Sequence, residues 1–189
     1  MADWESDAEL WIVRHGATEW SEAGRHTSRT DLPLEAVGVG QARALRERLT
    51  ATHFDLVLSS PRQRAVQTAV HAGFADPETD PDLAEWDYGD YEGLTTAQIR
   101  VTDPGWTVFD GTTPGGETAA EVTARADRVI ARAVTGRTLV FTHGHFGRVL
   151  AARWLRLSAA NGRYFDLDTA TINVLGFERI QPVLLRWNA

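Results

Sequence analysis

Three short apolar runs of this sequence each end abruptly in a polar or basic cluster. The runs and their clusters are 10–13 before Arg14-His15-Gly16, 54–58 before Ser59 through Arg64, and 138–141 before Thr142-His143-Gly144-His145. Apolar runs bounded by turn residues predict buried strands, and strands alternating with helices predict an α/β layer fold with a largely parallel sheet. Ligands of such sheets gather beyond the carboxyl ends of the strands, so we expect the three clusters to converge there.

The remaining pattern completes this layer fold. Apolar residues at helical spacing predict helices over about 35–50, 118–133 and 148–155. Ser60, Pro61 and Gln63 predict an N-cap, a first-turn proline and a capping-box partner for a further helix that ends at Gly73, and Thr118 with Glu121 predicts a second capping box. Residues 171–177 and 183–187 predict two strands that pair antiparallel. We expect a three-layer α/β/α sandwich whose mostly parallel sheet contains one antiparallel strand.

The length predicts one domain over residues 1–189. Residues 76–116 are rich in Pro, Gly, Asp and Thr, which predicts long loops and short helices that serve as a lid over one edge of the domain. The acidic N-terminus, MADWESDAEL, lacks the basic and apolar regions of a signal peptide, so we expect a cytoplasmic protein.

Charge and residue usage restrict the chemistry. A formal charge of −7 argues against binding nucleic acid or anionic membranes, no run approaches the roughly 20 apolar residues of a membrane span, and the lack of cysteine excludes disulfides and thiolate chemistry. All 19 residues counted as Lys or Arg are arginine. An anion site in this chain must therefore use arginine, histidine or backbone amides.

Six motifs follow one another along nearly the whole chain: RHGATEW at 14–20, GRHT at 24–27, SSPRQRAVQT at 59–68, LAEWDYGDYEG at 83–93, PGGET at 114–118 and THGH at 142–145. In their order and spacing these motifs resemble the histidine phosphatase superfamily, also called the cofactor-dependent phosphoglycerate mutase-like family. The resemblance implies a phosphoglycerate mutase-like fold. Within the superfamily the chain is most similar to small actinobacterial-type acid phosphatases, and residues 85–93 also resemble sedoheptulose-bisphosphatase members.

The resemblance implies that His15 is the nucleophile of a phosphohistidine mechanism, with Arg14, Arg64 and His143 around the transferring group and Glu85 as the acid. These residue types suit the reaction. An attacking imidazole must be neutral, with its other nitrogen held by a backbone carbonyl, and fixed donors must meet the charge that spreads over three phosphoryl oxygens. An acid that protonates the leaving group near neutral pH needs its pKa raised, for which the neighbouring Trp86 and Tyr88 are at hand.

The same resemblance gives a wider set of substrate contacts: Arg14, Arg25, Thr27, Arg64, Tyr88, Gly144 and His145. His145 is either a substrate-side contact or a structural histidine, and Trp106 either lines the mouth of the site or belongs to the core. Arg62 and Arg64 are two apart and do not share a helix face. We therefore interpret Arg62 as a solvated or structural residue.

The superfamily contains phosphatases and mutases. Mutases carry an arginine directly after the acid, a lysine further on and an arginine pair in a long insertion. Here Trp86 follows Glu85, no lysine exists, and Arg100 is the one arginine between Gly93 and Pro114. We therefore predict a metal-independent phosphomonoesterase of the acid phosphatase type that acts on small phosphorylated metabolites without a cofactor.

Several alternatives stay open at this point. They are a sugar bisphosphatase, a phosphoglycerate mutase, a non-catalytic phosphoprotein-binding module, and a metallohydrolase that uses His143 and His145. The sequence also leaves open whether the chain forms a homo-oligomer.

Overall fold

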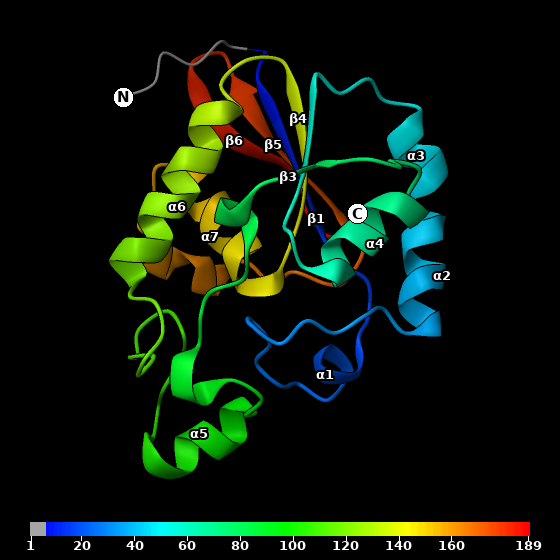
Figure 1. The fold of residues 1–189 in the computed structure, drawn as a ribbon. Coiled ribbons are helices and arrows are strands. Elements are labelled where there is room, and N and C mark those ends of the chain that lie inside the picture. Colours follow the sequence, from blue (N-terminus) through cyan, green and yellow to red (C-terminus); the bar gives the residue numbers. More distant parts are fainter. Residues whose placement is uncertain (1–6) are drawn as a thin grey trace.

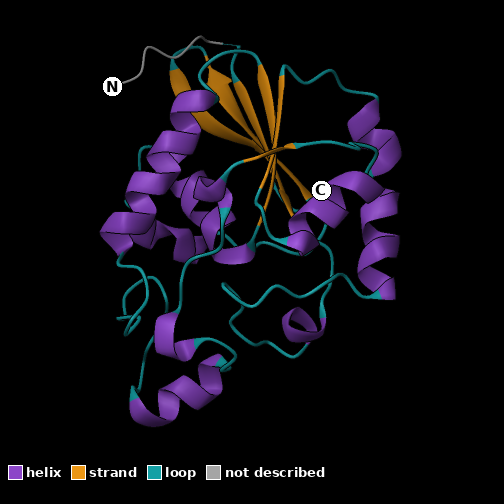
Figure 2. Cartoon of the chain, viewed as in Figure 1, coloured by secondary structure: helices purple, strands orange, loops and turns teal. Residues whose placement is uncertain are grey.

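The computed structural model describes residues 7–189, which form a six-stranded sheet between two layers of helices (Figures 1 and 2). The strands are β1 (Glu9–Arg14), β2 (Leu56–Ser59), β3 (Glu78–Thr79), β4 (Arg137–Thr142), β5 (Ile172–Glu178) and β6 (Gln181–Arg186), in the order β3-β2-β4-β1-β5-β6. Strand β5 pairs antiparallel with β1 and β6, and the other pairs are parallel. The expected sandwich with one antiparallel strand is confirmed. Residues 1–6, on which the signal-peptide expectation partly rests, lie outside the described residues.

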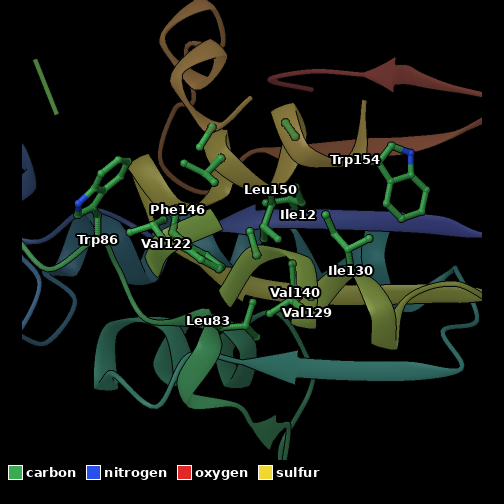
Figure 3. Packing of buried hydrophobic residues seen from close by; sticks show 14 of the residues in the cluster. Ile12, Leu83, Trp86, Val122, Val129, Ile130, Val140, Phe146, Leu150 and Trp154 are labelled. Carbon is green, nitrogen blue, oxygen red and sulfur yellow. The ribbon is translucent and has the colours of Figure 1, made fainter. Parts of the chain in front are cut away.

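The helices cover both faces of the sheet. One layer holds α2 (Ala36–Ala44), α3 (Arg46–Thr50) and α4 (Gln63–His71), and the other holds α6 (Ala119–Arg132) and α7 (Gly144–Trp154) (Figure 1). Ile12 and Val140 pack with the α6–α7 layer (Figure 3), and their neighbours Val13 and Phe141 pack with the opposite cluster. Because both faces of β1 and β4 are buried, these strands appear in the sequence as apolar runs. Within residues 7–189 no helix is long and apolar enough to cross a membrane.

Several element boundaries differ from the sequence expectation. The helix expected over 35–50 is divided into α2 and α3, and α7 begins at Gly144 rather than near residue 148. The capping box expected at Ser60 is wrong, because α4 begins at Gln63 and the Ser60 hydroxyl lies against His143 instead. The second expected capping box, Thr118 with Glu121, is confirmed.

The carboxyl ends of three strands meet at one edge of the sheet, as expected. Arg14 of β1 is paired with Thr142 of β4, and the next residue, His15, donates its backbone N–H to the Thr142 carbonyl at 2.9 Å. On the other side of β4, Ser60 donates its N–H to the Phe141 carbonyl at 2.9 Å. The central strand β4 therefore fixes the positions of the other two polar clusters.

The segment 76–116 consists of β3, two 3-10 turns, η1 (Pro81–Leu83) and η2 (Gly89–Tyr91), and the short helix α5 (Thr96–Thr102), all joined by loops. It lies beyond the carboxyl ends of the strands, near α1 (Glu19–Glu22) (Figure 1). An isolated bridge between Arg25 and Thr95, and a 2.9 Å bond from the His26 N–H to the Leu94 carbonyl, join it to the segment after α1. Strand β3 was not expected, and the function of the segment as a lid stays a prediction.

Two glycines allow α2 to contact the turn that carries His15. A Cβ atom at Gly38 would lie 2.2 Å from the Ala17 carbonyl oxygen, and one at Gly16 would lie 2.5 Å from the Gly38 oxygen. Both contacts are with backbone, which cannot move aside cheaply. Gln41 of α2 also accepts the Ala17 N–H at 2.8 Å. The close packing of α2 thus holds the backbone directly after His15.

Gly38→Ala should therefore displace α2 from this turn, lowering the free energy of unfolding by about 1–3 kcal/mol, with a loss of activity. The matched control is Gly40→Ala in the same helix, since a Cβ there would meet nothing within 4 Å among the described residues. Removing the backbone freedom of an exposed helical glycine should stabilise by about 0.5–1 kcal/mol. Urea unfolding measures both variants, and equal effects would contradict the close-packing argument.

Candidate active site

His15 is held as a neutral imidazole with one nitrogen available. Its Nδ1 atom lies 2.8 Å from the Gly16 carbonyl oxygen. A carbonyl only accepts, so Nδ1 carries the hydrogen and Nε2 keeps its lone pair. Burial, together with the positive charges of Arg64 and Arg14, lowers the pKa of His15 well below its usual value. The geometry agrees with the expected carbonyl partner and leaves Nε2 in the form that attacks an electrophile.

Two arginines beside His15, the buried Arg64 and the half-buried Arg14, have no carboxylate partner among the described residues. The Arg64 side chain is fully buried and donates from Nη1 to the Thr30 carbonyl and from Nη2 to the Thr27 carbonyl, both at 3.1 Å. Arg14 donates from Nη1 to the Leu167 carbonyl at 2.6 Å. Burial lowers the pKa of both guanidinium groups, and the negative charge of Glu85 acts in the opposite direction. Backbone carbonyls thus orient two positive charges without neutralising them.

Within residues 7–189, the buried side-chain polar atoms without a partner are Nε of Arg14, Arg62 and Arg64, Nδ1 of His143 and Oγ1 of Thr138. Thr138 lies at the start of β4, at the far end of the strand from the site, whereas the three arginines are close enough to His143 to lower its pKa. Leaving a buried donor unpaired costs about 1–3 kcal/mol, so a cluster of such donors at one place indicates a site that receives an acceptor from outside. Arg62 belongs to this group and is half-buried. Its interpretation as a solvated or structural residue stays a prediction.

His143 faces His15 across the site. It is the residue before α7, it is fully buried, and its ring centroid lies 5.3 Å from that of His15. Its Nε2 atom lies 2.7 Å from Oγ of Ser60. His145, two residues later, instead forms a 2.6 Å hydrogen bond through Nδ1 with the Tyr88 hydroxyl. The two histidines that resembled a metal pair therefore have different partners.

Glu85 is buried at the N-terminus of α7. Its Oε1 accepts the N–H groups of Trp86 and Phe146, both at 2.8 Å, and its Oε2 accepts the His145 N–H at 3.0 Å. Trp86 and Tyr88 pack nearby in the core, as the sequence indicated. Backbone donors at a helix N-terminus stabilise a carboxylate, an influence that sequence reasoning did not anticipate.

A ring cluster forms the other wall of the site. The ring of His26 lies 4.7 Å from Tyr88, 5.3 Å from Trp106 and 5.7 Å from His145. Burial lowers the pKa of His26 to about 4, and burial with the charge of His26 lowers that of His145 well below its usual value. Burial and the charge of Glu85 raise the pKa of Tyr88 well above its usual value. Trp106 is a core residue, the second of its two expected interpretations.

These walls enclose a cavity of about 260 Å³. The expected residues that line it are Arg14, His15, Arg25, Thr27, Glu85, Tyr88, Gly144 and His145. Arg64 and His143 are not among the lining residues, and the positive charge of Arg64 lowers the pKa of His15. The other lining residues, which sequence reasoning did not assign to the site, are Ser21, Gly24, His26, Thr96, Arg148, Asp166 and Leu167. Arg148 could have been predicted from the sequence, because a helix that begins at Gly144 places Arg148 one helical turn further along the same face.

Known proteins match this chain over nearly its full length. The model of the histidine phosphatase superfamily (branch 1) matches residues 10–189. An acid phosphatase of Mycobacterium tuberculosis is 43% identical over 175 residues, which cover 89% of this chain and 86% of that protein. The sedoheptulose 1,7-bisphosphatase of Saccharomyces cerevisiae is 36% identical, over 77% of this chain and 67% of that protein. The solved structure of an open reading frame product of M. tuberculosis superposes with a TM-score of 0.92 at 40% identity, covering 96% and 97% of the two chains.

The depressed pKa of His26 predicts acid-sensitive folding. Between pH 6.5 and about 4 the unfolded chain binds a proton at this residue that the folded chain does not, so stability falls as the pH falls. The loss attributable to His26 is at most about 3 kcal/mol. We expect His26→Gln to reduce the slope of unfolding free energy against pH in urea titrations. A slope in His26→Gln equal to that of the wild type would contradict the prediction.

Proposed function

The chain belongs to the histidine phosphatase superfamily, and we propose that it hydrolyses phosphate monoesters of small metabolites with the residues gathered around His15. The observation that carries this proposal is the neutral His15, whose Nε2 is available beside buried donors that lack partners. A nucleophile inside an anion site is what phosphoryl transfer through a covalent intermediate requires. A protein that only binds phosphate groups needs no nucleophile.

The reaction proceeds in two steps. The lone pair on Nε2 of His15 forms a bond to phosphorus, and the ester P–O bond breaks with its electron pair on the leaving oxygen, which takes a proton from Glu85. In the second step water gives a proton to Glu85 and attacks phosphorus, and the N–P bond breaks to release phosphate and restore His15. Glu85 thus acts first as acid and then as base.

The negative charge of the transferring phosphoryl group is stabilised by Arg14, Arg64 and His143. Charge spreads over three phosphoryl oxygens as the bond to the leaving group lengthens, and preorganised donors in a site shielded from water stabilise it most. The carbonyls that hold Arg14 and Arg64 fix these donors before substrate arrives. We therefore assign these three residues to stabilisation of the phosphoryl group.

Three backbone N–H groups hold the Glu85 carboxyl in place at the cavity wall, where it can face the leaving oxygen of a bound ester.

The leaving group of the substrate contacts the cavity wall formed by Arg25, Thr27, Tyr88, Gly144 and His145. The cavity volume of about 260 Å³ suits a small metabolite. A second candidate is a sugar bisphosphatase, as in the yeast relative. Arg25 and Arg148 on the wall favour it, since a second phosphate group requires a cation. A mutase is disfavoured by the missing carboxylate clamp, and Arg100 donates its Nε to the Trp106 carbonyl instead of lining the cavity.

We further propose a cytoplasmic location, since the reaction needs no oxidised cysteines and small phosphorylated metabolites are intracellular compounds. The part of the chain that the structure describes contains no membrane-spanning helix. The oligomeric state does not enter the mechanism, because every proposed role is filled from one chain.

The first test is phosphate release from a panel of phosphate esters, including paired sugar mono- and bisphosphates. Wild-type protein should release phosphate equally well with and without EDTA, and His15→Ala should lower kcat by at least about 10³-fold. Loss of the wild-type activity in EDTA would support a metallohydrolase. A wild type inactive on every ester, yet able to bind phosphorylated peptides, would support the binding module.

The second test is the pH dependence of kcat/KM. Because the pKa of His15 lies well below 6.5, the nucleophile stays neutral on acidification, and the acid limb should lie below pH 6.5. The need for a protonated acid should make activity higher below neutrality than above it. Glu85→Gln should slow hydrolysis of alkyl phosphates far more than that of p-nitrophenyl phosphate, whose leaving group needs no proton. A profile that rises steadily to about pH 9 would contradict the role of Glu85.

A further inference from the structure

The hydroxyl group of Ser60 is a buried polar group that the proposed reaction does not use. Ser60 follows β2 and is fully buried, and its Oγ lies 2.7 Å from Nε2 of His143. Its backbone N–H is bonded to the Phe141 carbonyl, which fixes the residue against the end of β4. Ser60 thus stands behind His143, on the side of the ring that Nε2 occupies.

The hydrogen bonds at Ser60 determine which atom donates. The Arg62 backbone N–H donates to Oγ at 3.3 Å, so one lone pair of the hydroxyl already serves as an acceptor. The hydroxyl hydrogen also needs a partner, because a buried hydroxyl without one is costly. Within residues 7–189 the acceptor in contact with Oγ is Nε2 of His143. We infer that Ser60 donates to Nε2 and thereby holds His143 as the tautomer that carries its hydrogen on Nδ1.

This tautomer gives the unpaired Nδ1 atom of His143 a function. Nδ1 is buried and has no partner among the described residues, and the ring faces that of His15. With hydrogen on Nδ1, His143 presents a donor to the group that His15 attacks. The other tautomer would present a lone pair, which repels phosphoryl oxygens. Ser60 is therefore a positioning residue that acts through His143, and this function rests on the phosphatase mechanism proposed above.

The surrounding charges support a neutral His143. Burial and the positive charges of Arg64, Arg62 and Arg14 lower its pKa well below the usual value. A carboxylate in place of Ser60 would counter this effect by favouring the imidazolium form. A hydroxyl fixes the tautomer without adding charge. His15 and His143 then carry hydrogen on the same atom, Nδ1, but His15 uses its Nε2 lone pair and His143 uses its Nδ1–H.

The direct test is the tautomer of His143 in solution. Two-bond ¹H–¹⁵N correlation spectra of ¹⁵N-histidine-labelled protein at neutral pH separate the two tautomers. The signals of His143 are identified among those of the six histidines by their loss in His143→Gln. We expect His143 to carry hydrogen on Nδ1 in the wild type and to move toward the Nε2-protonated form in Ser60→Ala. Hydrogen on Nε2 in the wild type, or an unchanged tautomer in Ser60→Ala, would overturn the inference.

The matched control is Ser59→Ala. Ser59 is the preceding residue and equally buried, but its hydroxyl donates to the Ser60 carbonyl at 2.9 Å. Ser60→Ala should lower kcat by about 10- to 100-fold with little change in KM, whereas Ser59→Ala should retain the wild-type tautomer and most of kcat. Equal losses in both variants with the tautomer retained would overturn the inference. Because the spectra need no turnover, an inactive wild type would refute the proposed function while the tautomer result stands separately.

Discussion

The site depends on the burial of Arg64, which has no carboxylate partner within residues 7–189. A buried guanidinium normally requires a counterion, because desolvation of an unpaired charge is expensive. Here two carbonyls, from Thr27 and Thr30, accept its Nη hydrogens. Glu92 supports the same loop, since its carboxylate accepts the Ser28 and Thr30 N–H groups at 3.0 Å and the Ser28 hydroxyl at 2.6 Å. Burial raises the pKa of Glu92, but the hydrogen bonds together lower it by more, so that the pKa lies below its usual value. The loop is thus organised to hold a charge that it does not neutralise.

This arrangement explains why binding and chemistry share the same residues. Nε atoms of Arg14 and Arg64 remain unpaired in the buried site, so the free energy spent on their desolvation is recovered when a phosphate group supplies oxygens. The same positive charges keep His15 neutral. One cluster therefore prepares the nucleophile and attracts its substrate. Arginine suits both tasks in a chain without lysine, because its fork can bond to carbonyls and phosphate at once.

Sequence reasoning predicted the strands and helices of this protein that have a clear apolar pattern. Apolar runs located β1, β2 and β4. Because ligands of such sheets gather beyond the carboxyl ends of the strands, the sequence also placed His15, Arg64 and His143 close together. The predictions were wrong where a side chain forms its hydrogen bond with a residue distant in the sequence rather than with a neighbouring one. Ser60 has the pattern of a helix cap, yet its hydroxyl pairs with His143, 83 residues away. Trp106 had two interpretations, and tertiary packing places it in the core. Strand β3 has two residues, too few for a periodic signal.

The two halves of the cavity differ in how their geometry is fixed, and this difference predicts where specificity varies. The phosphate side is built on the ends of β1, β2 and β4, whose backbone bonds to one another leave little freedom. The leaving-group side is built from side chains of loops and of the first turn of α7, where His26, Tyr88 and His145 pack as uncharged rings because burial disfavours their ionisation. A change in this ring cluster alters the shape of the pocket without changing the charge around His15. Selectivity among phosphate esters can therefore diverge between related proteins while the phosphoryl-transfer chemistry stays the same.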